Sequence, residues 1–246
     1  QFFERTYLTK GLTDLAAEVL RRLAGIRVET SPVFNMSTQF GGGKTHALAL
    51  LYHLAHNGPA ANGWHGVHKI LAQAGLGDVP RADTATFVGM QFDSLRGRGG
   101  DDGTPSRKTP WGEIAYQLGG ERSFAVVAEH DRQFIEPKGD VIRAMLPPDR
   151  PCLILMDEII NYVSTYRQMG YHNRLYNFVQ ALSETARSMD NVVLVVSIPA
   201  SELEMNADDQ RDYETLKKLL NRLGKPVVMA AETESAEIIR RRLFEW

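Results

Sequence analysis

The sequence lacks cysteine pairs, long apolar runs and a large excess of charge of either sign. Cys152 is the single cysteine among 246 residues, which excludes an intrachain disulfide and suits a reducing, cytoplasmic location. No apolar run approaches the roughly 20 residues that span a bilayer, and no signal peptide is visible, so no membrane partner is expected. The net charge of -2 excludes a globally basic nucleic-acid coat protein.

The composition is that of a globular core. Hydrophobic residues make up 43% and charged residues 24% of the chain. A chain of this length buries a core without a structural metal or a disulfide. We therefore expect one core over residues 1–246, with a helical lead-in at 1–30, a surface excursion at 57–83 and the start of a truncated helical lid at 235–246.

Strand and helix patterns alternate along the chain, which is typical of an α/β fold. Strand-like apolar runs lie at residues 32–37, 84–92, 152–158, 191–197 and 226–229. Helical patterns lie at residues 12–23, 47–54, 67–74, 110–145, 172–188, 216–223 and 235–246. The run at 152–158 stays apolar until two acids end it, which predicts a strand covered on both faces. The predicted fold is a mainly parallel sheet flanked by helices, with a flexible, solvated loop at 96–109.

A glycine-rich turn between a strand and a helix has the order that a phosphate-binding loop requires. Glycines let backbone N–H groups approach an anion closely, and the following helix directs its positive end to the same place. Lys44 is expected to neutralise the β- and γ-phosphates of a nucleotide, and the Thr45 hydroxyl to bind Mg²⁺. The candidate nucleotide-binding residues are Phe40, Gly41, Gly42, Gly43, Lys44, Thr45 and His46.

This turn departs from the usual spacing G-x-x-x-x-G-K-[ST], because Thr38 stands where that pattern has its first glycine. Gly41 and Gly42 can supply the flexibility instead. The alternative is an ordinary glycine turn that caps a helix and leaves Lys44 exposed. The strand before the turn and the apolar helix after it favour the phosphate-binding loop.

Two acids, Asp157 and Glu158, end the apolar run at 152–158. Ligands of parallel sheets bind at the carboxyl edge, so these acids should lie beside the phosphate-binding loop. Asp157 is expected to hold Mg²⁺, and Glu158 to orient and polarise the attacking water. The alternative is an acidic helix cap after a core strand.

These segments resemble the AAA-type P-loop ATPases. The resemblance rests on the turn ending in Lys44-Thr45, the apolar strand ending in Asp157-Glu158 and a later strand ending in the polar Ser197. It implies a P-loop core that binds ATP with Mg²⁺, in which Ser197 contacts the γ-phosphate.

The same resemblance implies a homo-oligomer, because rings of this type complete each site with an arginine from a neighbouring subunit. Arg222, before the strand pattern at 226–229, resembles that catalytic arginine. Arg240, Arg241 and Arg242 are candidates for contacting nucleotide within the same chain. The alternative for each of these arginines is a solvated charge on a helix.

Three further segments are similar to large prokaryotic ATPases that are catalogued mainly as a domain of unknown function, some of them beside restriction or phage-defence genes. Because the chain begins at Gln1 and stops at Trp246, where a lid would begin, we expect a piece of a longer protein with further domains. The similar segments are Thr6-Tyr7-Leu8-Thr9, Gln39 to His46 and Glu237 to Glu245.

Two other patterns are weaker. Histidines three apart, at 53 and 56 and at 65 and 68, have the spacing of a zinc site, but no cysteine or acid cluster stands close by, so surface histidines are favoured. Residues 162–178 interleave aromatic and basic side chains, which can bind nucleic acid by stacking on bases or can pack into a core. The near-neutral net charge favours the core.

The sequence therefore predicts a Mg²⁺-dependent ATPase that serves as the motor or switch module of a larger prokaryotic protein. Two alternatives stay open. The chain can be a nucleotide-binding switch without turnover, or a small-molecule kinase in which the loop at 96–108 covers the acceptor. The Asp157-Glu158 pair favours hydrolysis over transfer to a metabolite.

Overall fold

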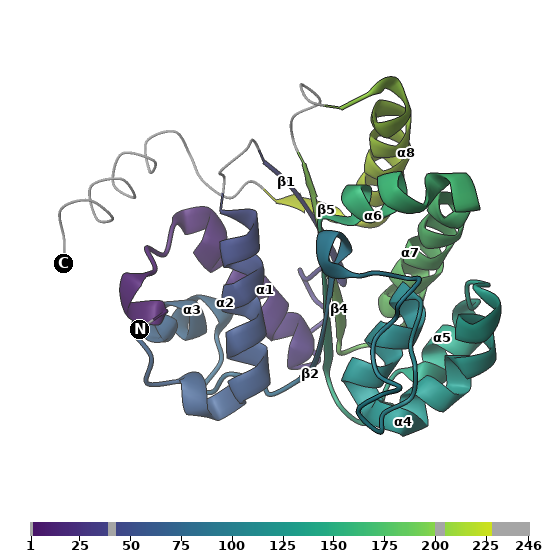
Figure 1. The fold of residues 1–246 in the computed structure, drawn as a ribbon. Coiled ribbons are helices and arrows are strands. Elements are labelled where there is room, and N and C mark those ends of the chain that lie inside the picture. Colours follow the sequence, from purple (N-terminus) through teal and green to yellow (C-terminus); the bar gives the residue numbers. More distant parts are fainter. Residues whose placement is uncertain (1, 39–42, 200–204, 228–246) are drawn as a thin grey trace.

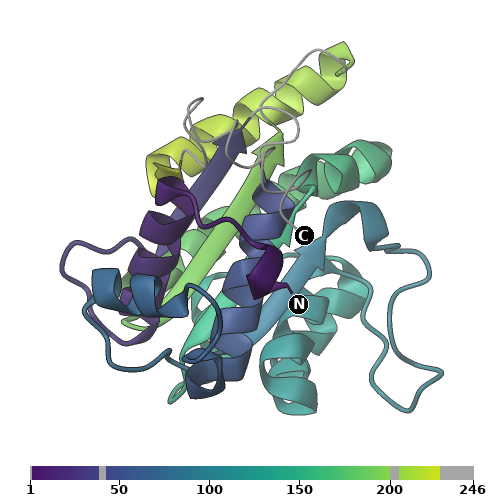
Figure 2. The same ribbon diagram turned by 90° about the vertical axis from the view of Figure 1, so that its left-hand side faces the viewer.

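A parallel β-sheet forms the centre of the molecule. The computed structural model describes residues 2–38, 43–199 and 205–227. Within these residues every strand pairing of the sheet is parallel, and the strand order is β2-β3-β4-β1-β5. Figure 2 shows the arrows of β1 and β4 running side by side in one direction. The strands are β1 (Val33–Thr38), β2 (Asp83–Val88), β3 (Cys152–Asp157), β4 (Val192–Pro199) and β5 (Lys225–Val227).

Helices cover both faces of this sheet (Figure 1). One face carries α1 (Lys10–Leu23), α2 (Lys44–Asn57) and α3 (Val67–Ala74). The other face carries α4 (Pro110–Gln133), α5 (Gly139–Met145), α6 (Ile159–Tyr166), α7 (Tyr171–Ser188) and α8 (Ala207–Leu223). Short 3-10 helices are η1 (Phe3–Arg5), η2 (Gly58–Ala61), η3 (Gly89–Gln91) and η4 (Arg167–Met169). None of the described helices combines the length and apolar character that crossing a membrane requires.

Strand β3 lies in the interior of the sheet with all six of its residues buried. Its side chains alternate between the two faces. Leu153 and Leu155 pack with the layer of α1, α2 and α3. Ile154 and Met156 pack with the layer of α4 to α8. This two-sided burial explains why the strand is apolar from end to end, and it confirms the prediction of a parallel sheet flanked by helices.

The sequence placed most helices and strands correctly, and the differences have physical causes. The strand expected at 84–92 ends at Val88, because Gly89 lies against the backbone of Glu158 and starts the 3-10 helix η3. Helix α6 was not predicted. The helix expected at 235–246, with Arg240, Arg241 and Arg242, lies outside the described residues, as do residues 228 and 229 of the last predicted strand.

The segment at 57–83 is less superficial than its composition suggested. Val67 and Ile70 of α3 are completely buried, and so is Ala61 of η2. These side chains belong to the same apolar cluster as Leu15 of α1. The excursion therefore contributes to the core on the face that carries α2.

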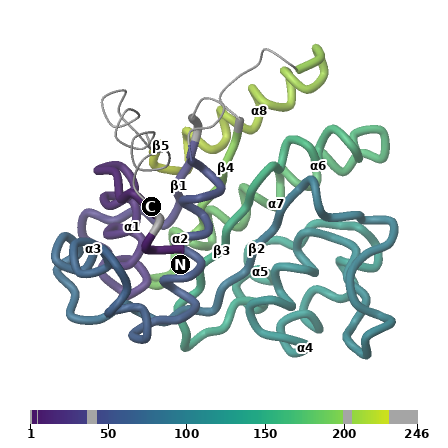
Figure 3. The backbone as a smooth tube through the Cα atoms, turned by 60° about the vertical axis from the view of Figure 1, so that its left-hand side comes forward, coloured from purple at the N-terminus to yellow at the C-terminus, as the bar shows by residue number. Residues whose placement is uncertain are grey.

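The loop at 96–108 is mostly exposed, but its buried Arg107 anchors it to the rest of the fold. It runs beside α4 (Figure 3) and closes on itself through an antiparallel bridge between Arg98 and Arg107. The Arg107 side chain is 7% exposed and donates from Nε to Glu113 Oε2 at 2.9 Å. Its guanidinium also lies 4.0 Å from the ring centroid of Tyr116.

Replacing Arg107 with alanine should destabilise the fold strongly, because the carboxylate of Glu113, itself 5% exposed, would lose its closest cation. We expect the free energy of unfolding, measured by urea denaturation, to fall by about 3 kcal/mol. The matched control is Arg132→Ala, which removes an exposed pair with Glu129 and should leave the free energy of unfolding nearly unchanged. Equal losses in the two variants would show that the loop at 96–108 is not anchored through Arg107.

Candidate functional site

Helix α2 begins directly at the glycine-rich turn. Gly43 is its N-terminal cap and has φ 75° and ψ 15°, a left-handed conformation that glycine adopts without strain. Helix α2 then begins at Lys44, so that the unpaired N–H groups of its first turn lie at this end. Phe40, Gly41 and Gly42 lie outside the described residues. The described part of the turn thus ends in a helix start with the polarity that favours anions.

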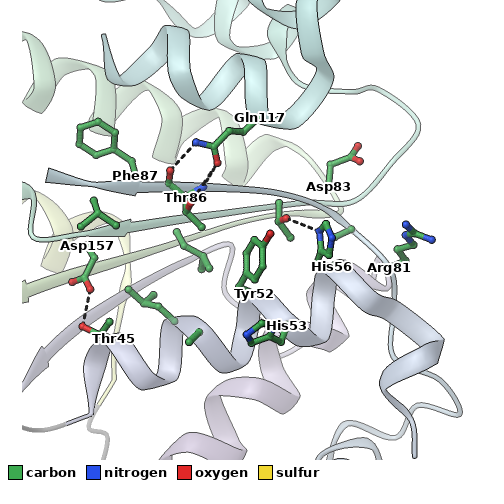
Figure 4. A pocket seen from close by; sticks show the side chains of 16 residues that line it. Thr45, Tyr52, His53, His56, Arg81, Asp83, Thr86, Phe87, Gln117 and Asp157 are labelled. Atoms are coloured by element: carbon green, nitrogen blue, oxygen red, sulfur yellow. Dashed lines mark hydrogen bonds between the residues drawn. The ribbon is translucent and has the colours of Figure 1, made fainter. Parts of the chain in front are cut away.

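Thr45 and Asp157 meet at the carboxyl edge of the sheet, although 112 positions separate them in the chain. The Thr45 hydroxyl donates to Asp157 Oδ2 at 2.9 Å, as Figure 4 shows. Asp157 is the last residue of β3 and is 7% exposed. Its other oxygen, Oδ1, accepts the backbone N–H of Glu158 at 3.0 Å. The two sequence segments predicted to share one site are therefore in direct contact.

The connections between strands explain why the site lies here. After β1 the chain turns to α2 on one face of the sheet, whereas after β3 and β4 it turns to α6 and α8 on the other. Strands β1 and β4 are neighbours, so their connections diverge at the carboxyl edge. Open α/β sheets bind their ligands at the place where neighbouring connections diverge in this way.

Ser197 lies beside Asp157. The register pairs Met156 with Val196, so the next residues of β3 and β4 are at the same level. Leu155 and Val195 face the layer that carries α2, and side chains alternate along a strand, so Asp157 and Ser197 face that layer too. Ser197 is 2% exposed. A hydroxyl and a carboxylate therefore occupy adjacent strands on the face toward Lys44 and Thr45.

Lys44 shares the electrostatic environment of Asp157. Partial burial lowers the pKa of the Lys44 ammonium, and the negative charge of Asp157 opposes that shift. The lysine is half-buried, so its charge is screened less than on an open surface. The start of α2 thus carries the positive charge of Lys44 close to the buried carboxylate of Asp157.

Glu158 is held in an unusual backbone conformation. It has φ 53° and ψ 32°, which costs a residue with a side chain about 1 kcal/mol or more. Burial raises the pKa of its carboxyl group, and the neighbouring charge of Asp157 raises it further. A carboxylate with a raised pKa accepts a proton more readily, which suits a general base.

The N-terminal segment anchors His46. The Thr6 hydroxyl lies 3.0 Å from His46 Nε2, and the ring of Phe2 stacks on the imidazole with centroids 4.6 Å apart. The sequence predicted His46 near the phosphates, but it offered no signal for these partners. His46 thus joins the residues before α1 to the first turn of α2.

Arg222 does not join this site within the chain. It is an exposed residue in the last turn of α8. Strand β5 follows at Lys225, which pairs with Phe34 near the beginning of β1. Because the strands are parallel, Arg222 lies toward the amino edge of the sheet, whereas Thr45 and Asp157 lie at the carboxyl edge.

The two weaker patterns provide neither a base-stacking surface among the core aromatics nor a metal cluster among the described residues. Tyr162, Tyr166, Tyr176 and Phe178 are each at most 8% exposed and belong to the core between the sheet and its helices, so they offer no base-stacking surface. Within the described ranges, no group of three or more His, Cys, Asp or Glu side chains is arranged to hold a metal ion.

Gly89 is the residue that lets Glu158 take its position. A Cβ at Gly89 would lie 2.3 Å from the carbonyl oxygen of Glu158, which is impossible without a shift of backbone. Gly89→Ala should lower the free energy of unfolding in urea by about 1–3 kcal/mol. Gly77→Ala is the control, since a Cβ at Gly77 meets nothing within 4 Å. A Gly89→Ala protein as stable as the Gly77→Ala protein would contradict this packing.

The raised pKa of the Glu158 carboxyl group should make the stability of the fold depend on pH. Because folding favours the protonated carboxyl, the stability it supports is present below its ordinary pKa of 4.5 and is lost as the pH rises through the folded-state pKa. Glu158→Gln should therefore raise the melting temperature at neutral pH, and the difference should vanish below pH 4.5. Glu184→Gln, on the exposed side of α7, controls for the loss of a carboxylate. A Glu158→Gln protein that melts lower at neutral pH would overturn the assignment.

Comparison with known proteins identifies the family of the chain. No curated protein matches it. A family model, that of the DUF499 N-terminal domain, matches residues 1–69 and 101–232 and leaves residues 70–100 unmatched. Because the matched segments make up more than half of the sequence, the chain belongs to the family of the DUF499 N-terminal domain, a domain of unknown function.

Proposed function

We propose that this chain is an AAA-type P-loop ATPase core that binds ATP with Mg²⁺ and hydrolyses the bond between the β- and γ-phosphates. The observation that carries the proposal is the contact of 2.9 Å between Thr45 Oγ1 and Asp157 Oδ2 at the carboxyl edge of a parallel sheet. A hydroxyl after a lysine at a helix start, next to a carboxylate at the end of a neighbouring strand, is the arrangement that holds a nucleotide's metal ion.

The phosphate groups would be held by the start of α2. Lys44 supplies a cation there, and the left-handed Gly43 directs the chain into the helix so that first-turn N–H groups point outward. Burial lowers the pKa of Lys44, but Asp157 opposes the shift. An anion at this place would meet a positive charge and several donors at once.

The donor set fits a magnesium ion. Mg²⁺ prefers hard oxygen ligands and is held by one or two protein carboxylates together with substrate phosphates. Thr45 offers a hydroxyl and Asp157 a carboxylate, so a separate cluster of acids is not needed. When bound, the ion supplies neutralisation of the phosphate charge.

Glu158 and Ser197 complete the reacting end. The raised pKa of Glu158 suits it to take a proton from a water molecule that attacks the γ-phosphorus. Ser197 is level with Asp157 on the adjacent strand and can donate a hydrogen bond to a γ-phosphate oxygen. Glu158, directly after β3, would then accept the proton, and Ser197, on the neighbouring β4, would stabilise the charge on the γ-phosphate.

Arg222 would act on another subunit. It is exposed and lies toward the opposite edge of the sheet from Thr45, so a catalytic contact requires a second copy of the chain. The proposal therefore includes a homo-oligomer, which the resemblance to AAA-type ATPases implies, and in it the core serves as the motor or switch module of a larger protein. The resemblance to ATPases near phage-defence genes suggests work on nucleic acid.

Phosphate release from Mg-ATP tests the proposal. The unchanged chain should release phosphate, and Glu158→Gln should lower turnover by about 100- to 10,000-fold while ATP still binds. Asp157→Asn should abolish turnover because the buried carboxylate beside Thr45 is lost. Glu184→Gln, an exposed acid of α7, is the matched control and should leave turnover unchanged.

Each outcome of this assay separates the proposed ATPase from its alternatives. If the unchanged chain binds ATP but releases no phosphate, either as a monomer or as an oligomer, it is a nucleotide-binding switch without turnover. Transfer of phosphate to an added metabolite, with little release to water, would indicate a kinase. Neither binding nor release would overturn the assignment of Lys44 and Thr45 to a nucleotide.

A further inference from the structure

A groove runs away from the site between α2 and β2. The cavity has a volume of about 620 Å³ and extends from Thr45 and Asp157, along one side of α2, to His56 and Arg81 (Figure 4). Binding sites for small molecules have volumes of roughly 300–1,000 Å³, so the groove has room for a ligand as large as a nucleotide.

The position of β2 in the sheet explains the groove. Strand β2 lies at the edge, and its buried residues Ala85 and Phe87 face the layer of α4. On the opposite side Thr84 and Thr86 remain partly exposed. The facing side of α2 presents the small Ala49, whereas the larger Leu50, Leu51 and Leu54 are buried elsewhere in the apolar cluster. Ala49 on one wall and Thr84 and Thr86 on the other contribute to leaving the space open.

An added peptide strand cannot easily occupy this edge, because Gln117 already pairs with it. Its side-chain Oε1 accepts the backbone N–H of Thr86 at 2.7 Å, and its Nε2 donates to the Thr86 carbonyl at 3.0 Å. A second bond, from Gln117 Nε2 to Glu113 Oε1 at 2.7 Å, fixes the amide in place. Gln117 thus blocks the addition of a peptide strand at Thr86, but the space between α2 and β2 remains available to a small ligand.

The far end of the groove carries excess positive charge. Arg81 forms no ion pair within 4.0 Å with any residue that the structure describes. Asp83, an acid that lines the same end of the groove and lies within the electrostatic reach of Arg81, is paired through its Oδ2 with Arg150 Nε at 2.9 Å. His56 lines the same end of the groove, and its Nδ1 lies 3.3 Å from Thr84 Oγ1. An arginine fork with an imidazole and a hydroxyl can surround a tetrahedral oxyanion.

The middle of the groove is aromatic and apolar. Tyr52 points into it, and its ring is stacked on that of His56, with centroids 5.2 Å apart and planes 9° apart. Leu48 and Val88 line the same stretch. A ligand with a ring or an apolar body would bury it here, with its anionic group directed toward Arg81.

We propose that this groove binds a small phosphorylated molecule, with the phosphate at Arg81 and His56 and the body of the molecule along Tyr52 and Thr86. The phosphate position, at the far end of the groove from Thr45, is distinct from the start of α2 and does not depend on nucleotide hydrolysis. Residues 81–88, which form one wall of the groove, lie in the segment that the family model leaves unmatched, whereas the wall formed by α2 lies in a matched segment.

Histidine NMR tests this proposal directly. We would label the imidazole nitrogens with ¹⁵N and titrate the Lys44→Ala chain with inorganic phosphate and with phenyl phosphate, so that the start of α2 contributes little. The signals of His53 and His56 should shift and saturate with both probes. Phenyl phosphate should bind about 3- to 10-fold more tightly, because its ring packs along Tyr52.

Two variants locate the probe in the groove. Arg81→Ala should weaken both probes by about tenfold or more, because a charge-assisted contact to phosphate is lost. Ala49→Leu should fill the middle of the groove and weaken phenyl phosphate more than inorganic phosphate. Arg211→Ala, at an exposed arginine of α8, is the control and should change neither affinity.

The proposal fails if the imidazole signals of His53 and His56 do not shift, or if Arg81→Ala leaves the affinity for both probes unchanged. It also fails if only His46, at the start of α2, responds in the unchanged chain and the response disappears in Lys44→Ala. If the unchanged chain does not hydrolyse ATP but the signals of His53 and His56 still shift with the phosphate probes, the proposed ATPase is refuted and the proposed groove site is not.

Discussion

The hydrogen bond between Thr45 and Asp157 is the constraint on which the arrangement of the site depends. It joins the second residue of α2 to the last residue of β3 and therefore holds the end of that strand against the start of the helix. The strand order places β4 between β1 and β3, so Ser197 is brought to the same level without any contact of its own being required. A hydroxyl, an ammonium and two carboxylates consequently converge where the chain leaves the sheet toward opposite faces.

The surrounding structure stabilises features that would be unfavourable alone. Glu158 keeps a left-handed backbone because Gly89 allows the next strand end to approach its carbonyl group. At the sheet edge, Glu113 accepts from Arg107 and from Gln117, and Gln117 in turn pairs with Thr86. The loop at 96–108 is thereby linked to the strand that forms one wall of the groove. The site and the groove are positioned by buried polar contacts as well as by the apolar core.

The sequence predicted what depends on local pattern. The apolar run of β3 and the periodic helices around Leu20 and Leu50 appear where expected, because burial on a face repeats with the period of each element. Helix α6 was not predicted, because it follows Glu158, whose left-handed backbone conformation cannot be recognised from the sequence pattern. The burial of Arg107 and the groove beside Tyr52 were also missed, because both arise from side chains of distant segments that the fold brings together.

The central claim is that Lys44, Thr45 and Asp157 hold a nucleotide's phosphates together with a metal ion. The most direct measurement is titration calorimetry of a non-hydrolysable ATP analogue, with and without Mg²⁺, on the unchanged chain and on Thr45→Ala. Mg²⁺ should strengthen binding to the unchanged chain, and Thr45→Ala should lose this dependence. Binding that is indifferent to Mg²⁺ in both proteins, or no binding to the unchanged chain, would contradict a nucleotide and metal site at Lys44, Thr45 and Asp157.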